Sequence, residues 1–333
     1  ETPGVPAGRV VADSVRPDFS RDGARLFLAT GKPPDPPADP DAKTPPTVNV
    51  DLWSYKDPII QPMQKVRAEQ ERSRTYRAVV HLADRKFVQL ATPDLPTVNP
   101  GEDAARAIGN SDLPYRMEIS WDQTYNDTYL VDLKTGQSQK VLEHWGGSGT
   151  SMSPGGKYVL YFDERTGHWF TYRTSDGARV NLTEKLPVRF QQENDTPDLP
   201  GPYGSGGWTA NDQSVLLYDE FDIWEVKPDG SGARMITNGS GRAQHVAFRY
   251  RSLDPEERVV PTDKPLLLSA TDDVTRATGF YRTAFTGTTA PAKVIMLDKA
   301  FGAVTKAPKA DTVVFTLSRF EEFPDLWVSD TNF

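Results

Sequence analysis

Serine is the residue that could supply a nucleophile in this chain, because the sequence contains no cysteine. An α/β-type serine hydrolase carries its nucleophile in a Gly-x-Ser-x-Gly turn between a strand and a helix. Four serines lie in glycine-rich turns, and none has glycine both two positions before and two positions after it: Ser148, Ser205, Ser231 and Ser240. The sequence therefore predicts no catalytic residue in this chain.

Histidine could act as a base or as a metal ligand, but the spacing of the four histidines supports neither role. They are His81, His144, His168 and His245. No two of them lie four residues apart, the spacing that places two metal ligands on one face of a helix. The glycine-rich stretches 146–149 and 204–207 do not precede a helix, so they are not suited to hold a phosphate group. We expect no metal and no cofactor.

Acidic pairs occur at three expected inter-strand turns and could bind a cation or an amine. They are Asp219-Glu220, followed by Asp222, then Asp272-Asp273, and Glu321-Glu322. Exposed turn residues of this kind need no function, and the sequence favours that interpretation.

Three residues of one long segment are candidates for contacting a substrate or a neighbouring domain. Arg189, Phe190 and Tyr203 lie in residues 184–207, a stretch rich in Pro and Gly. Arginine and aromatic side chains are enriched at interfaces, and long ordered loops often carry function. A surface loop without any partner is the alternative interpretation of the segment.

The elements that position these residues follow a repeated strand pattern, seen best at Trp208–Val226. Runs of β-branched and aromatic residues alternate there with turns at Asn211-Asp212 and Asp219-Glu220, which indicates strands joined by tight turns. The same pattern recurs at 152–172 and at 19–28. Aromatic or leucine positions of the closing strand recur 40 to 57 residues apart: Leu130, Phe170, Trp224, Tyr281 and Trp327.

Repeats of this length with about four strands each are typical of a β-propeller. We therefore predict an all-β fold of about five to six four-stranded antiparallel blades, in a ring that could be incomplete. Asp51-Leu52-Trp53 is expected to be a further closing strand, and Arg116–Trp121 to be a strand of the second blade. Five tryptophans at matching blade positions are expected in the core: Trp53, Trp169, Trp208, Trp224 and Trp327.

The 333 residues are expected to form one propeller domain, with an extended lead-in at 1–14 and an insertion at about 31–74. Residues 32–41 are too rich in proline to join a sheet, and Gln61–Arg74 has the pattern of a short, largely solvated helix. The net charge of −8 argues against binding to nucleic acid or to anionic membrane surfaces. No apolar run approaches the roughly 20 residues that span a bilayer.

Longer strings carry a more specific resemblance. Asp51-Leu-Trp-Ser-Tyr-Lys-Asp-Pro, Lys86-Phe-Val-Gln-Leu-Ala, Tyr129-Leu-Val-Asp-Leu, Asp222-Ile-Trp-Glu and Phe323-Pro-Asp-Leu-Trp-Val-Ser-Asp together resemble the propeller of bacterial prolyl oligopeptidase-family serine peptidases. In that family an α/β-hydrolase domain with a Ser-Asp-His triad follows the propeller, which restricts access to the active site. The triad has no counterpart here, and the paired glutamates that bind a substrate amine in the family's dipeptidyl peptidases are not recognisable.

The resemblance implies that this chain is the non-catalytic propeller portion of a serine peptidase. Its implied partners are a C-terminal α/β-hydrolase domain of the same parent chain and a peptide substrate, and its implied location is periplasmic or secreted, with the cytoplasm still open. The alternative is a stand-alone scaffold propeller that binds a protein partner in the periplasm.

Overall fold

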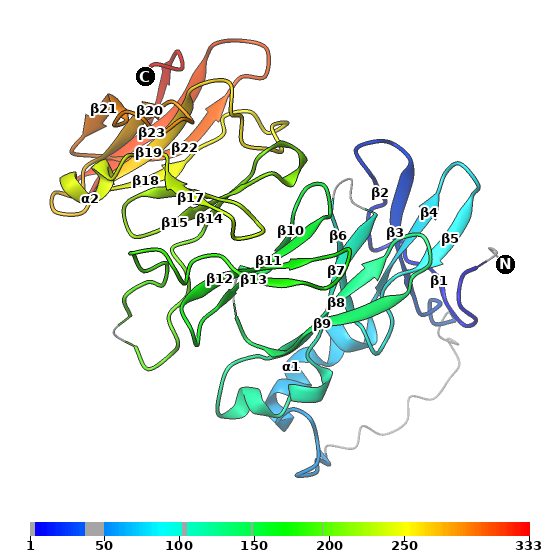
Figure 1. Ribbon diagram of the computed structural model, residues 1–333. Coiled ribbons are helices and arrows are strands. Elements are labelled where there is room, and N and C mark those ends of the chain that lie inside the picture. Colours follow the sequence, from blue (N-terminus) through cyan, green and yellow to red (C-terminus); the bar gives the residue numbers. More distant parts are fainter. Residues whose placement is uncertain (1–3, 37–49, 102–104, 148, 195) are drawn as a thin grey trace. The chain divides into compact units, whose positions relative to one another are not determined.

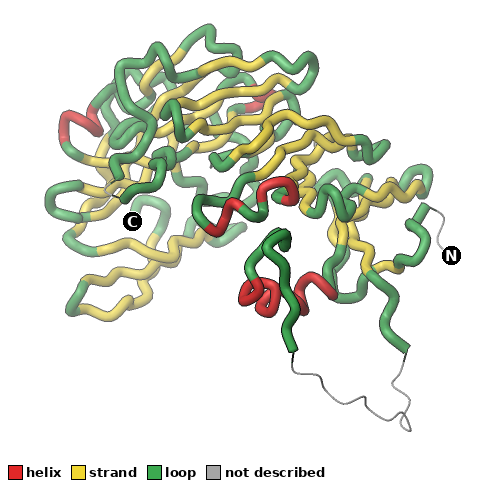
Figure 2. Tube along the Cα trace, turned by 90° about the horizontal axis from the view of Figure 1, so that it is seen from below, coloured by secondary structure: helices red, strands yellow, loops and turns green. Residues whose placement is uncertain are grey.

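The computed structural model describes residues 4–36, 50–101, 105–147, 149–194 and 196–333. In this part of the chain, six antiparallel sheets follow one another in sequence (Figure 1). Helix is confined to short segments between strands, as Figure 2 shows. The sheets contain five, four, four, four, four and three strands, which is the blade pattern of a β-propeller and confirms the predicted fold class.

The chain divides into two compact units, Glu1–Gly146 and Gly147–Phe333. The first unit holds two sheets. The first sheet has the order β1-β3-β4-β5, with β2 also paired to β3. Its strands are β1 (Val10–Val11), β2 (Asp18–Phe19), β3 (Arg25–Gly31), β4 (Tyr76–His81) and β5 (Lys86–Gln89). The second sheet consists of β6 (Thr97–Pro100), β7 (Arg106–Ser111), β8 (Asn126–Asp132) and β9 (Ser138–Trp145).

The second unit holds four sheets, each with its strands in sequence order. The first two consist of β10 (Ser151–Met152), β11 (Tyr158–Asp163), β12 (His168–Arg173) and β13 (Arg179–Asn181), then β14 (Ser205–Trp208), β15 (Val215–Tyr218), β16 (Ile223–Val226) and β17 (Ala233–Met235). The last two consist of β18 (Val246–Tyr250), β19 (Leu266–Asp272), β20 (Thr278–Thr283) and β21 (Ala292–Leu297), then β22 (Ala300–Lys306), β23 (Val313–Arg319) and β24 (Glu322–Ser329).

The helical elements are few and short. The predicted helix at 61–74 is confirmed as α1 (Gln61–Arg72), which has proline in its first turn and no buried residue. A second helix, α2 (Ser240–Gln244), lies between β17 and β18. The described residues also contain three 3-10 turns: η1 (Leu113–Tyr115), η2 (Glu118–Ser120) and η3 (Ala210–Asp212). Half of the proline-rich stretch expected at 32–41, residues 37–41, lies outside the described residues, and residues 32–36 form no strand.

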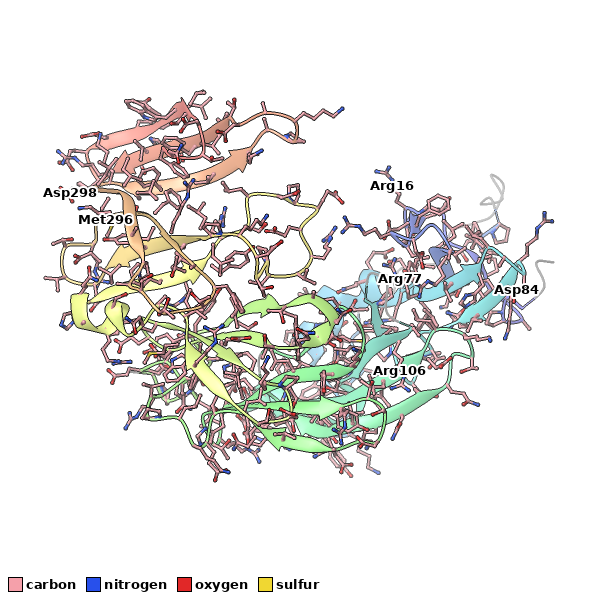
Figure 3. The ribbon with its side chains drawn as sticks, turned by 45° about the horizontal axis from the view of Figure 1, so that its top comes forward. Arg16, Arg77, Asp84, Arg106, Met296 and Asp298 are labelled. Carbon is pink, nitrogen blue, oxygen red and sulfur yellow. The ribbon has the colours of Figure 1, made fainter. Side chains whose placement is uncertain are left out.

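Apolar side chains between successive sheets form the core of each unit. In the second unit, Leu160, Phe162 and Trp169 pack with Trp208 and Trp224 of the following sheet. A neighbouring cluster, which includes Leu216 and Ile223, lies between the sheets β14–β17 and β18–β21. Met296, on β21, also packs against this second cluster. Asp298 follows the end of β21, in the turn to β22 (Figure 3).

Two predicted strands are wrong. Residues 51–53 form no strand, because β3 pairs directly with β4 and the sheet takes no strand from the segment between them. Arg116–Trp121 forms turns instead of a strand, and β6 supplies the first strand of the second sheet. Side-chain contacts hold the start of these turns: Tyr115 donates a hydrogen bond to Asp127 on β8, and Arg116 donates to Asp112 at 3.1 Å.

Two of the five tryptophans expected in the core are exposed. Trp169, Trp208 and Trp224 are buried, whereas Trp53 is 64% exposed and Trp327 is 49% exposed. Trp53 lies outside any sheet. Trp327 lies on β24, which pairs with β23 and has no second neighbour among the described strands.

Candidate functional site

The 184–207 segment contains most of the long connection from β13 to β14 and the start of β14, and hydrogen bonds hold it in place. The backbone N–H of Tyr203 donates to the carbonyl of Phe190 at 3.0 Å, and that of Gln192 donates to Gly201 at 2.8 Å. The Gln191 side chain donates to the carbonyl of Glu164 at 2.8 Å. These bonds draw the two arms of the connection together, so the segment has the form of a hairpin anchored on the sheet β10–β13.

Phe190 is the anchor of this connection and does not face solvent. Its side chain is fully buried and packs edge-to-face on Trp224, with ring centroids 6.1 Å apart. The sequence suggested Phe190 as a contact residue because aromatic residues are common at interfaces. The fold instead uses its ring to fill the core between two sheets.

The other two predicted residues of this segment, Arg189 and Tyr203, line one cavity of about 480 Å³. Arg189 is exposed and Tyr203 is half-buried. The remaining lining residues come from the same segment and from the sheet β14–β17 with its following helix: Pro187, Val188, Gln191, Glu193, Glu220 and Arg242. Two guanidinium groups, two carboxylates and one phenol therefore surround a single space.

Arg242 is positioned by two carboxylates of the β15–β16 turn. Its Nη2 lies 3.4 Å from Asp219 Oδ1, and its Nη1 lies 3.8 Å from Glu220 Oε2. The guanidinium also lies over the ring of Phe221, 5.3 Å from its centroid. These contacts orient the arginine toward the cavity, while half of its side chain remains accessible to solvent.

Asp219 and Asp222 were expected as exposed turn residues, and both are buried. Asp219 accepts hydrogen bonds from the backbone of Phe221 and Asp222 and from the indole N–H of Trp224 at 2.8 Å. Asp222 accepts from Thr237 and from the first amides of α2, at Gly241 and Arg242. Buried carboxylates of this kind hold the turn and the helix together, because an ionised carboxylate needs several donors once it leaves water.

A half-buried arginine, Arg249 of β18, contacts two of the residues that line the cavity, Tyr203 and Glu220. Its guanidinium carbon is 4.8 Å from the ring centroid of Tyr218 and 5.9 Å from that of Tyr203. Its donors bond the carbonyls of Phe248 and Glu220, at 2.7 and 3.1 Å. Burial lowers the pKa of Arg249 and raises that of Tyr203, and the Glu220 carboxylate raises the pKa of Tyr203 further.

The cavity is suited to binding and contains no activated nucleophile. Arginine and carboxylate groups recognise peptide carbonyls, amides and charged ends, and a phenol offers both an apolar face and a hydrogen bond. Glu193, Arg242 and Arg249 were not singled out by the sequence, and Glu220 was favoured there as an exposed turn residue without function. They lie up to 56 positions apart, and only the fold brings them together.

The four histidines have ordinary partners. His81 contacts the carbonyl of Leu133, His144 contacts Glu118, and His168 contacts the hydroxyl of Thr183. His245 ends α2 and packs against Phe221. In the described residues, no serine hydroxyl is hydrogen-bonded to a histidine ring, and no group of three or more His, Asp or Glu side chains is arranged to hold a metal ion.

The described residues include no helix that is long and apolar enough to cross a membrane.

No protein-family model matches the sequence, and no curated protein matches it. Among solved structures, the chain is similar to the β-propeller domain of the Trilobed protease from Pyrococcus furiosus, at 14% identity and a TM-score of 0.42, covering 97% of this chain and 83% of that one. It is also similar to oligogalacturonate lyase from Vibrio parahaemolyticus, at 13% identity and a TM-score of 0.44, covering 94% of this chain and 73% of that one.

A third neighbour is Porphyromonas gingivalis dipeptidyl peptidase 4, at 12% identity and a TM-score of 0.48, covering 90% of this chain and 41% of that one. The neighbours thus include propellers of peptidases and of other proteins. At these scores the similarity carries no argument about activity.

Proposed function

We propose that this chain is the non-catalytic propeller portion of a prolyl oligopeptidase-family serine peptidase, and that residues 1–333 form one propeller domain. In this role the chain controls which peptides reach a C-terminal hydrolase domain. The sequence strings at 51–58, 86–91, 129–133, 222–225 and 323–330 support the family, and the succession of antiparallel sheets is compatible with it. We propose a periplasmic or secreted location, in line with the cysteine-free composition.

The observation that carries the proposal is the cavity of the 184–207 connection. Its volume of about 480 Å³ is within the range of roughly 300–1,000 Å³ that is usual for ligand pockets. Arg189 and Glu193 are both exposed, and neither has an ion-pair partner in the described part of the chain. Opposite charges of this kind, beside Tyr203, favour an extended polar polymer such as a peptide.

The experiment is a kinetic comparison in the full-length protein. The double variant Arg189→Gln/Glu193→Gln removes both charges and leaves the net charge unchanged. We expect the ratio of kcat/KM for long versus short chromogenic peptides to change about threefold or more, because only long peptides reach the propeller. A matched control is Arg165→Gln/Glu184→Gln, two exposed residues outside the cavity. Equal ratios in wild type and both variants contradict the proposal.

The reading frame after Phe333 provides an independent test. A Gly-x-Ser-x-Gly turn encoded downstream supports the peptidase. A stop codon there supports the alternative of a scaffold propeller that binds a protein partner. One observation favours that alternative, namely the exposed apolar side chains of β24, among them Phe323, Leu326 and Val328.

A further inference from the structure

A second cavity of about 440 Å³ lies in the second unit, beside the sheet β18–β21. Its walls come from the end of β18, the loop 251–265, the start of β19, the end of β20 and the end of β22, together with Thr331. It shares no lining residue with the cavity of the 184–207 connection. One part of its surface is apolar and is formed by leucine, proline and alanine: Leu253, Pro255, Pro261, Pro265, Leu266, Leu267, Ala307 and Pro308.

One of the two carboxylates that line this cavity is already neutralised. Glu257 accepts hydrogen bonds from Tyr250 at 2.7 Å and from Ser252 at 3.0 Å, and it forms an ion pair with Lys264 at 2.6 Å. Burial alone would raise the pKa of Glu257, but these three donors hold it below its usual value. The other acidic lining residue, Asp254, is exposed and accepts a hydrogen bond from the backbone of Glu256.

Three cationic side chains of the same cavity have no charged partner among the described residues. Arg282 donates to the Asn332 side-chain oxygen and to the Thr331 carbonyl, both at 2.7 Å. Lys306 donates to the carbonyls of Ala307 and Ala310. Within the described residues, no carboxylate lies within ion-pair distance of these two groups or of Arg251, which is exposed.

With Asp254 counted and the Glu257–Lys264 pair cancelling, these three cationic groups leave the cavity a net charge of about +2, which attracts an anion. The surrounding protein has a net charge of −8, so this local excess of positive charge is opposite to the overall balance. Two of the three groups are guanidinium groups, whose planar donors match both oxygens of a carboxylate. The leucine and proline walls then favour an apolar body next to that carboxylate.

We propose that this cavity binds a small organic carboxylate with an apolar body, held by Arg251, Arg282 and Lys306. The free C-terminal end of an apolar peptide has this chemistry, and so does a free apolar carboxylic acid. The proposal does not depend on a peptidase function, because it rests on a different cavity and is tested by binding to the chain itself.

The test is calorimetric titration of the 333-residue chain with N-acetyl-Phe-Leu, with its C-terminal amide, with N-acetyl-leucine and with acetate. We expect the free acid to bind at least about tenfold more tightly than the amide, since the charge-assisted bonds are lost. Acetate should bind at least about tenfold more weakly than N-acetyl-Phe-Leu, because it lacks the apolar body. N-acetyl-leucine binding as tightly as N-acetyl-Phe-Leu indicates a free acid as the ligand, and tighter binding of the dipeptide indicates a peptide end.

Arg251→Gln is the informative variant, because the Arg251 side chain has no partner among the described residues and its loss should leave the fold intact. We expect it to weaken N-acetyl-Phe-Leu binding about tenfold, and Arg251→Gln/Lys306→Gln to weaken it further. The matched control is Arg276→Gln/Lys293→Gln, which removes the same charge from the sheet β18–β21 at positions outside the cavity. Equal affinity for acid and amide, or unchanged affinity in a folded Arg251→Gln protein, overturns the proposal.

Discussion

At the scale of single residues, Arg189 and Phe190 are chain neighbours with opposite environments. Arg189 is exposed at the cavity, whereas Phe190 has none of its surface accessible and packs on Trp224. We expect Phe190→Ala to lower the free energy of unfolding by about 3–5 kcal/mol. Arg189→Ala should change it by less than about 0.5 kcal/mol. Urea denaturation of both variants checks this, and similar values for the two would show that Phe190 is not an anchor.

The same contrast limits how the 184–207 connection can be altered. Removing residues 190–202 as a block would remove the Phe190 ring from the core and would change stability and binding together. Charge-neutral side-chain changes at exposed positions keep the two effects apart, which is why Arg189 and Glu193 are the informative pair.

At the scale of elements, one buried carboxylate connects two consecutive sheets. Asp212, in η3, accepts hydrogen bonds from the Ser153 hydroxyl at 2.7 Å and from the backbone of Gly155 and Lys157, in the β10–β11 turn. Asp212 also has a φ of 57°, which Asn tolerates. We expect Asp212→Asn to lower the free energy of unfolding by about 1–3 kcal/mol, since donors are left without a charged acceptor.

Asp229 provides the control for this prediction, because it lies in an exposed turn of the same sheet and accepts a hydrogen bond from Ser231. Asp229→Asn should change stability much less than Asp212→Asn. The measurement is the denaturation midpoint of each variant. A smaller effect at Asp212 than at Asp229 would show that Asp212 does not stabilise the fold by connecting the two sheets.

In the first unit, a buried carboxylate makes stability depend on pH. Asp127 accepts hydrogen bonds from Tyr115 at 2.7 Å and from the backbone of His144, and it pairs with Lys140 at 2.8 Å. Burial acts to raise the pKa of Asp127, but Lys140, Tyr115 and His144 together lower it below its usual value. The stabilisation that ionised Asp127 contributes is therefore complete above its unfolded-state pKa of about 3.9. It is lost as pH falls through the lower pKa that Asp127 has in the folded state.

We expect wild type to lose stability between about pH 4 and pH 2 more steeply than Asp127→Asn, which lacks the titrating group. Denaturation midpoints at several pH values in this range test the difference. Asp84→Asn is the control, because Asp84 lies in the exposed β4–β5 turn (Figure 3). Parallel pH profiles for wild type and Asp127→Asn would exclude the mechanism.

At the scale of the whole molecule, the chain should not hydrolyse peptides. Acyl transfer needs a nucleophile, its base and oxyanion donors in one place. There is no cysteine, and the serines of the glycine-rich turns lack the Gly-x-Ser-x-Gly pattern. Incubation of the purified chain with a fluorophosphonate probe and with chromogenic Pro- and Ala-linked peptides should give neither labelling nor turnover. Stoichiometric labelling of one serine would disprove this.

The sequence by itself determined the type of architecture. Strand runs such as Val215–Tyr218 and Ile223–Val226, with turn residues between them, specify antiparallel hairpins through local backbone preferences and side-chain alternation. Proline near the start of Gln61–Arg72 and its helical spacing likewise determined α1. These signals act over a few residues, so they can be recognised in the sequence alone.

Only the tertiary structure decided which side chains are buried and which meet. Trp224 and Trp327 occupy the same position in the repeat, yet Trp224 lies between two sheets and Trp327 lies on a strand with one neighbour. Phe190 is buried because it packs between two sheets. Asp219 and Asp222 are buried because they accept hydrogen bonds from Trp224 and from the start of α2, where Arg242 lies. Burial and electrostatic pairing depend on such distant neighbours, and local sequence patterns do not encode them.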